Sequence, residues 1–264
     1  MLTAAKNQFR VILLSLKYNI MREMTNRASF LTNVLFMVLN NATFLIQWQL
    51  LFHLKPEIGG YAFHEVMVLW GLAASTYGFS HILFQRAFQL PPLILQGKLD
   101  SFLVQPKNIL LSVITSATNS SAIGDLIYGY LIIVIFRFSI PNLLLFTLFT
   151  ILGGLIMAAF AVITGSFSFW LVRGDLLSDN LNNVIVNFGT YPDSIFKSGV
   201  RLLLYTIVPV GFVVYQPLHI ILNFNLTALL GVIAFTLGIC LLAFFLFYKG
   251  LKRYTSSNLM SARI

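Results

Sequence analysis

Residues 143–170 read LLLFTLFTILGGLIMAAFAVITGSFSFW and contain no charged side chain. A helix of about 20 apolar residues crosses the hydrocarbon core of a bilayer, which is about 30 Å thick. This stretch is long enough and apolar enough to do so, and it therefore predicts a transmembrane helix. Further apolar runs on both sides of it extend the same pattern along the chain.

The composition of the whole chain agrees with that prediction. Of its 264 residues, 58% are hydrophobic and only 9% are charged, whereas a soluble domain carries about 25% charged residues. So few charges cannot wet the surface of a soluble protein of this length. The composition excludes a soluble enzyme and a disordered or fibrous chain, and it predicts an all-α integral membrane protein with a single transmembrane domain over residues 1–264.

The apolar runs divide the chain into predicted membrane spans. Prolines, glycines and polar clusters mark the breaks between them. The break at residues 85–108 is a polar loop, expected on the cytoplasmic side. We expect six transmembrane helices, at residues 28–52, 65–84, 109–136, 143–170, 176–190 and 226–247.

Residues 4–25 have the pattern of an amphipathic helix that lies in the membrane interface. On a helical wheel, its large apolar residues fall within an arc of about 100° and its cations lie beside that arc. The alternative is that this segment begins a long first span. The apolar residues are Phe9, Ile12, Leu13, Leu16 and Ile20, and the cations are Lys6, Arg10 and Lys17.

Residues 191–224 are apolar but contain Pro192, Pro209, Gly211 and Pro217. We expect two short re-entrant helices on the outer side, since broken backbone is tolerated in a membrane only where protein or water satisfies it. One additional span is the alternative. It would place the basic C-terminal tail outside, against the charge distribution.

The distribution of Lys and Arg predicts the orientation. With both termini in the cytoplasm, 13 of the 17 Lys and Arg residues face the cytoplasm, and only Lys55, Arg137, Lys197 and Arg201 face outside. Cytoplasmic loops of membrane proteins carry such an excess. The net charge of +9 is therefore interpreted as contact with membrane lipid rather than with nucleic acid.

Patterns for covalent chemistry are missing from the sequence. No phosphate-binding loop is present, because Gly97-Lys98 has no upstream glycine and is followed by Leu-Asp. The four histidines have no metal-ligand spacing, Cys240 stands alone, and no nucleophile motif occurs. We therefore predict no catalytic, cofactor-binding or metal residues, no cofactor, and a passage or scaffold rather than an enzyme.

Three stretches together resemble the ABC-2-type permeases, in particular a subfamily with a cytoplasmic Gly-x-Leu-Asp…Pro motif. Residues 58–106 carry that motif as Gly97, Leu99, Asp100 and Pro106. FWLVRGDLLSDNLNNVIVNFGTYPDSIF begins at residue 169, and GLKRYTSS covers residues 250–257. One departure is Gln105, where the subfamily usually has arginine.

The resemblance implies a permease subunit of an ATP-driven exporter, in the plasma membrane of a bacterial cell. Two permeases, identical or sister chains, pair in the membrane, and each docks on a separate cytoplasmic ABC ATPase. The cargo would be an amphipathic, lipid-like or drug-like compound. A secondary transporter or channel without an ATPase is the alternative, although only one ionisable group lies centrally in a span and no inverted repeat is present.

The loop at residues 85–108 is the candidate coupling element, because a permease without a nucleotide site must receive force through a short rigid element. A helix that starts near Phe88 would hold Pro91-Pro92 in its first turn, where proline is tolerated. The alternative is an ordinary loop. The residues expected to couple to the ATPase are Arg86, Phe88, Ile94, Gly97, Lys98, Leu99 and Asp100.

Polar residues inside the spans are the candidates for a pathway. Asp125 lies near the middle of the third predicted span, where a carboxylate must face protein or water, and structural pairing is favoured over proton relay. Asn33, Asn40, Asn41, Gln47 and Trp48 share one face of the first span, and Asp175, Asp179, Asn183 and Asn187 recur every four residues in the fifth. We place Asp179, Asn183 and Asn187 on the translocation path; hydrogen bonding between helices is the alternative.

Overall fold

The structure is a computed structural model and describes residues 2–255. Within these residues the regular elements are all helical, as predicted, and the only β pairing is an isolated bridge between Ile58 and Tyr61. The helices are α1 (Leu2–Glu23), α2 (Arg27–Leu54), α3 (Phe63–Phe88), α4 (Leu90–Leu95), α5 (Asp100–Leu103), α6 (Ile109–Ile114), α7 (Ala122–Arg137), α8 (Ile140–Ser166), α9 (Gly174–Gly189), α10 (Ser198–Thr206), α11 (Gln216–Leu222) and α12 (Leu226–Leu251), with short turns η1 (Phe167–Phe169), η2 (Asp193–Ile195) and η3 (Gly211–Tyr215).

In this part of the chain four helical segments are long and apolar enough to cross a membrane, which confirms the membrane class. They are Arg27–Leu54, Phe63–Leu95, Ile140–Phe169 and Leu226–Leu251. A fifth is possible if α10 and Gly211–Leu222, which meet at 82°, form one broken span. The helices α7 and α9, each with 16 residues, are about 24 Å long and so shorter than the hydrocarbon core.

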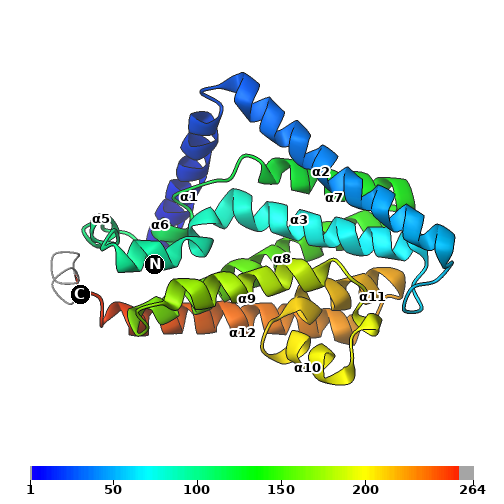
Figure 1. Cartoon of the computed structure of the whole chain (residues 1–264). Helices are drawn as coiled ribbons and strands as arrows, with labels where there is room; N and C mark the ends of the chain where they lie inside the picture. The colour runs from blue at the N-terminus through cyan, green and yellow to red at the C-terminus, as the bar shows by residue number, and fades with distance from the viewer. Residues whose placement is uncertain (1, 256–264) are drawn as a thin grey trace.

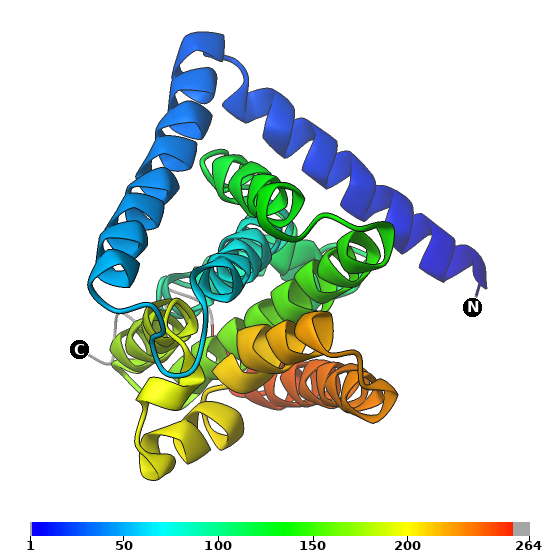
Figure 2. The ribbon, with the colours of Figure 1, turned by 90° about the vertical axis from the view of Figure 1, so that its right-hand side faces the viewer.

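The long elements alternate in direction along the chain (Figure 1). In space α7 lies between α2 and α3, and α8 packs against α3, α9 and α12. The two ends of the described chain lie toward the end of the bundle that also holds α4 and α5, whereas α10 and α11 lie at the opposite end. In the most apolar part of the segment Phe63–Leu95, which contains α3, 72% of the residues are buried, whereas in that of α2 only 6% are. Figure 2 shows α2 along one side of the bundle and α1 along another, with α3 nearer the centre.

The third predicted span differs from the structure, because it is not one continuous helix. The first part, α6, ends at Ile114, and the chain is irregular up to Ala122, where α7 begins. Hydroxyl side chains next to the break bond to nearby backbone, Thr115 to the Leu111 carbonyl (2.7 Å) and Ser116 to that of Val113 (2.7 Å). Such local bonds compete with helix formation. Asp125 consequently lies in the first turn of α7 and not in mid-span.

The N-terminal helix α1 bonds to this irregular segment through its polar side. Ser15 Oγ and Asn19 Nδ2 both donate to the carbonyl of Thr115, at 2.9 and 3.1 Å. The large apolar residues Phe9 and Tyr18 are exposed on α1. Of the predicted apolar face, Phe9 and Leu13 are exposed, whereas Ile12, Leu16 and Ile20 are half-buried. The placement of residues 4–25 in the membrane interface stays a prediction.

Small residues bring α2, α3 and α7 into close contact. A Cβ added to Gly129 of α7 would lie 2.5 Å from the Gly71 carbonyl oxygen of α3, and one added to Gly124 would lie 2.5 Å from the Val34 carbonyl oxygen of α2. Close backbone approach through small residues is a main source of helix association in membranes. These contacts hold α2 and α3, which line the cavity described below, against α7.

At the end of the bundle that holds α10 and α11, a buried carboxylate joins three segments. Asp193 is 1% exposed and accepts hydrogen bonds from Tyr61 Oη (2.8 Å) and from the Arg201 guanidinium, and His219 Nε2 lies 3.9 Å away. Burial alone would raise the pKa of Asp193, but these three neighbours stabilise the carboxylate and lower its pKa to about 2. The cluster fastens the bent 191–224 segment to the loop between α2 and α3.

We predict that Gly129→Val destabilises the protein, because the added methyl groups must displace backbone of α3. Overpacking of this kind costs about 1–3 kcal/mol. Gly238→Val on α12 is the matched control, since a Cβ there meets nothing within 4 Å. The melting temperature in detergent should fall for Gly129→Val only, and an equal fall in both variants would contradict the close-packing role.

We also predict that Asp193→Asn destabilises the protein at neutral pH. The folded pKa lies below the reference value of 3.8, so the carboxylate stabilises the fold above that value and loses the effect as the pH falls toward about 2. The shift corresponds to about 2 kcal/mol. Thermal unfolding should show a difference from wild type at pH 7 that shrinks below about pH 4. Glu57→Gln, at an exposed acid in the loop between α2 and α3, should show no such difference.

Candidate functional site

The predicted coupling loop forms a compact turn between two short helices. Pro91 lies in the first turn of α4, where the missing amide proton costs nothing. Gly97 follows this helix with φ of 67°, and the amides of Gly97 and Lys98 bond to the carbonyls of Ile94 (3.2 Å) and Leu93 (2.9 Å). This left-handed helix end needs glycine, which gives the first residue of the sequence motif a physical role.

Burial separates the predicted coupling residues into two groups. Ile94 and Leu99 are fully buried and Gly97 is also buried, so these three shape the loop and cannot contact a partner directly. Arg86, Phe88 and Asp100 are half-buried, and only Lys98 is exposed. The exposed surface of the loop lies further along the chain, at Leu103 and at Val104, which is 83% exposed.

The three stretches that carry the family resemblance meet at this end of the bundle. Phe169 packs against Phe247 (5.9 Å between ring centroids) and against Tyr254 (6.3 Å). Tyr254 also lies beside Asp100, and burial together with this carboxylate raises the pKa of the Tyr254 hydroxyl to about 12. Sequence reasoning missed Tyr254, because only the fold brings it to Asp100. Ser256 and Ser257 of the tail stretch, and Arg263 of the charge count, lie outside the described residues.

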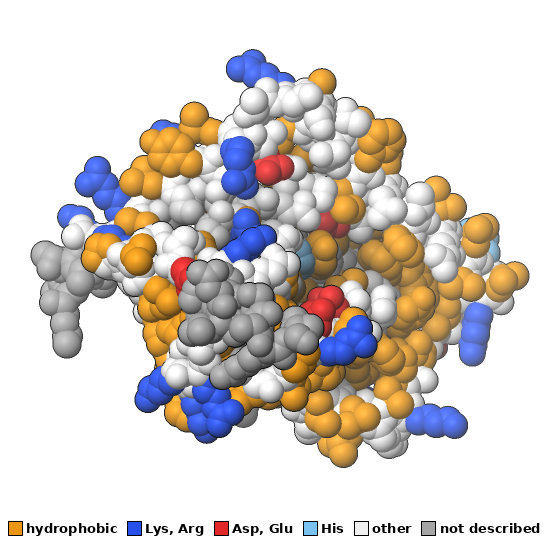
Figure 3. Space-filling model, turned by 60° about the vertical axis from the view of Figure 1, so that its left-hand side comes forward, with side chains coloured by type: hydrophobic (Ala, Val, Ile, Leu, Met, Phe, Trp, Pro, Cys, Tyr) orange, Lys and Arg blue, Asp and Glu red, His pale blue; other side chains and the backbone are white. Residues whose placement is uncertain are grey.

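Apolar side chains are exposed at the same end, next to basic ones. Val172, in the turn before α9, is 86% exposed, and Leu171 is also exposed. Figure 3 shows Lys and Arg side chains across and around this end of the molecule. Exposed cations on the chain segments at this end are Lys98, Arg173, Lys252 and Arg253. Exposed apolar residues set among cations suit contact with another protein rather than with hydrocarbon.

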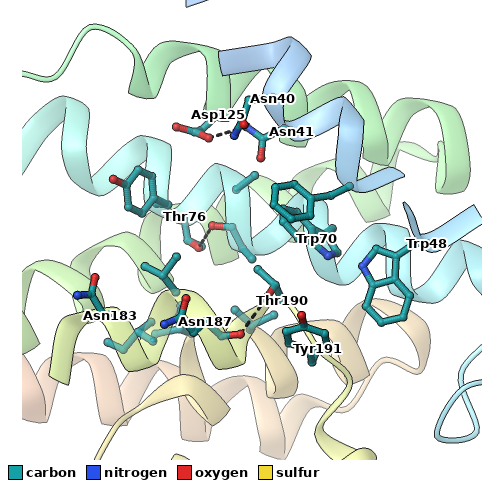
Figure 4. Close-up of a pocket in the computed structure, with 18 of the residues that line it drawn as sticks. Asn40, Asn41, Trp48, Trp70, Thr76, Asp125, Asn183, Asn187, Thr190 and Tyr191 are labelled. Atoms are coloured by element: carbon teal, nitrogen blue, oxygen red, sulfur yellow. Dashed lines mark hydrogen bonds between the residues drawn. The ribbon is translucent and has the colours of Figure 1, made fainter. Parts of the chain in front are cut away.

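A cavity of about 540 Å³ lies between α2, α3 and α9 (Figure 4). One wall carries Asn41 and Asp125, and the opposite wall carries Asn183 and Asn187. Of the residues predicted on a translocation path, Asn183 and Asn187 line the cavity and Asp179 does not. The polar face of the first span also contributes, through Asn40, Asn41, Gln47 and Trp48.

The two polar roles considered for α9 fall to different residues. Asn182 donates to Thr164 Oγ1 of α8 (3.1 Å) and to the Ser178 carbonyl (2.8 Å), so this amide joins helices. Asn183 and Asn187 are exposed. Within residues 2–255 their side chains make no hydrogen bond to protein, although the Asn187 carbonyl accepts one from Thr190. Their amides are therefore available to water, a ligand or another chain.

Asp125 is held by a neighbouring helix. Asn41 Nδ2 of α2 donates to Asp125 Oδ1 at 2.6 Å and also to the Met37 carbonyl at 3.0 Å. The second carboxylate oxygen, Oδ2, is buried and has no hydrogen-bond partner in the described part of the chain. One carboxylate oxygen, Oδ1, thus has the expected structural pairing, and the other, Oδ2, does not.

Comparison with known proteins now identifies the family. The sequence model of a family described as "ABC-2 family transporter protein" matches residues 38–258, which include all but one of the residues that line the cavity and the loop at residues 85–108. No curated protein and no solved structure matches the chain significantly. Among the described residues, no group of His, Cys, Asp or Glu could hold a metal ion.

Proposed function

The chain belongs to the family of ABC-2 transporter proteins, and from that premise we propose that it is the transmembrane permease subunit of an ATP-driven exporter. It is a multi-pass membrane component of a transporter. In the proposal, a separate cytoplasmic ABC ATPase hydrolyses ATP, and the permease carries an amphipathic compound out of the cytoplasm across the cell membrane.

The exposed amides on α2 and α9 are the observation that carries this proposal. Asn40 and Gln47 on α2, like Asn183 and Asn187 on α9, are exposed in a single chain, and in this proposal both helices cross the membrane. Hydrocarbon cannot satisfy an amide, and burying one without a partner costs several kcal/mol, roughly 2–7. A second permease subunit over this face would cover the amides and enclose a polar path between the two chains.

The direction of the chain supports six crossings with both termini in the cytoplasm. The described ends lie toward the same end of the bundle, which requires an even number of crossings. In this arrangement α6 with α7 forms one crossing, α9 forms another, and the bent α10–α11 segment re-enters from outside. The excess of Lys and Arg then lies on the cytoplasmic side, as the positive-inside rule demands.

The cytoplasmic end supports docking of an ATPase. Val104 and Val172 are the apolar anchors, and Lys98 and Arg173 lie near them in sequence. Ile94, Gly97 and Leu99 hold the loop in shape behind this surface. Because α4 packs against α8 and η1, movement of the loop would pass directly to the membrane helices.

We predict that Val104→Asp removes the ATPase, because a charge in the docking surface must be desolvated. Retention of the ATPase during purification of the permease should fall about tenfold or more, which corresponds to about 1.4 kcal/mol. Leu54→Asp is the matched control, since Leu54 is 86% exposed at the C-terminal end of α2, away from the proposed docking surface. Wild-type retention by Val104→Asp would contradict docking at this loop. A wild-type permease that never retains an ATPase would favour the secondary transporter.

We also predict that cysteines at Asn183 and Asn187 cross-link two permeases. In a Cys240→Ser background, a flexible bifunctional maleimide should give a covalent pair of this chain, or of this chain with a sister permease. A cysteine at Leu230 of α12, which is exposed on another helix, should give monomer only. Efficient pairing through Leu230 and none through α9 would move the subunit interface to α12.

A further inference from the structure

The walls of the central cavity carry charge of one sign. Asp125 is the only charged residue among its lining residues, and Lys, Arg and His do not occur there. Asp125 is 5% exposed, and within residues 2–255 it forms no ion pair with a cationic side chain. The cavity therefore contains an acid without a counter-charge.

The Asp125 carboxylate is only half satisfied. Asn41 holds Oδ1 in place, and Oδ2 is buried with no partner in the described structure. A carboxylate at membrane depth is stabilised by a nearby positive charge. Since the lining side chains supply none, a cationic ligand is the group whose charge complements this wall.

Aromatic rings form the rest of the environment. Phe44 of α2 stacks on Trp70 of α3 at 4.4 Å between ring centroids, and Trp48 meets Tyr191 edge-on at 5.9 Å. All four line the cavity, as does Tyr77. Aromatic faces attract cations electrostatically and also accept apolar groups. A volume of about 540 Å³ falls within the range that holds a drug-sized ligand.

We propose that this cavity binds an organic cation with an apolar body, placing the cationic centre against Asp125 and the body among Phe44, Trp48 and Trp70. This inference rests on the proposed function, because it names the class of compound that the permease carries. Asn41 is a positioning residue, because its Nδ2 donates to Asp125 Oδ1 at 2.6 Å and fixes the carboxylate in the cavity wall. The amides of Asn183 and Asn187 face it from the opposite wall.

Three probes of similar shape and different charge test the proposal: tetraphenylphosphonium, neutral tetraphenylsilane and the tetraphenylborate anion. The full-length permease is studied in nanodiscs with Trp170→Phe, so that fluorescence reports only Trp48 and Trp70, which both line the cavity. The phosphonium should bind saturably and at least about tenfold more tightly than the other two. Equal binding of all three probes would overturn the proposal.

Two substitutions locate the effect. Asp125→Asn should weaken phosphonium binding about tenfold or more and leave the neutral probe unchanged. Glu57→Gln, which removes a negative charge from an exposed site outside the cavity, should leave all three affinities unchanged. An equal loss of phosphonium affinity in both variants would mean that only the net charge of the protein matters, and it would overturn the proposed site.

A third variant keeps the test decisive if Asp125→Asn does not fold. Asn40 lines the cavity but is exposed, so Asn40→Lys adds a positive charge without disturbing the Asn41–Asp125 contact. It should weaken the phosphonium and strengthen the borate, and an unchanged preference would overturn the proposal. The binding assay needs no ATPase, so the two proposals fail separately. If the probes bind without charge preference, only the proposed substrate class is contradicted. If the permease retains no ATPase, only the proposed exporter function is contradicted.

Discussion

Hydrocarbon offers no hydrogen-bond partner, and the arrangement of this bundle follows from where its polar side chains find one. Asn182 bonds to Thr164 and so joins α9 to α8, and Asn41 bonds to Asp125 and so joins α2 to α7. The side chains of Asn40, Gln47, Asn183 and Asn187 have no such partner within residues 2–255 and line one cavity. A single subunit therefore leaves a polar face that the membrane cannot cover.

The two ends of the bundle are fastened by different chemistry. At the end with α10 and α11, one buried carboxylate, Asp193, collects Tyr61, Arg201 and His219 and ties loops that are far apart in sequence. At the other end, Phe169 packs against α12 and Tyr254, beside the loop that contains Asp100. The loop at residues 85–108 is thus packed against this end of the bundle, where α4 contacts α8 and η1.

The membrane class and most helices could be predicted from the sequence, because apolar runs and their length depend on local composition alone. The third span was predicted as one helix, and local bonds of Thr115 and Ser116 break it. The helices α7 and α9 are shorter than the hydrocarbon core, so their lengths alone do not determine the number of membrane crossings. Periodicity identified Asn183 and Asn187 as one polar face of α9, and the structure places both on the cavity.

The sequence by itself determined an all-helical membrane protein, its family resemblance and the polar stripe of α9, since each of these lies in neighbouring residues. Only the tertiary structure decided which side chains meet. It set Asp125 against Asn41 across 84 positions and buried Ile94 and Leu99 behind the exposed Val104. It also brought the tail residue Tyr254 to Asp100. Helical periodicity reveals the face on which a residue lies, but the partner of that face depends on packing between distant segments, which no local pattern records.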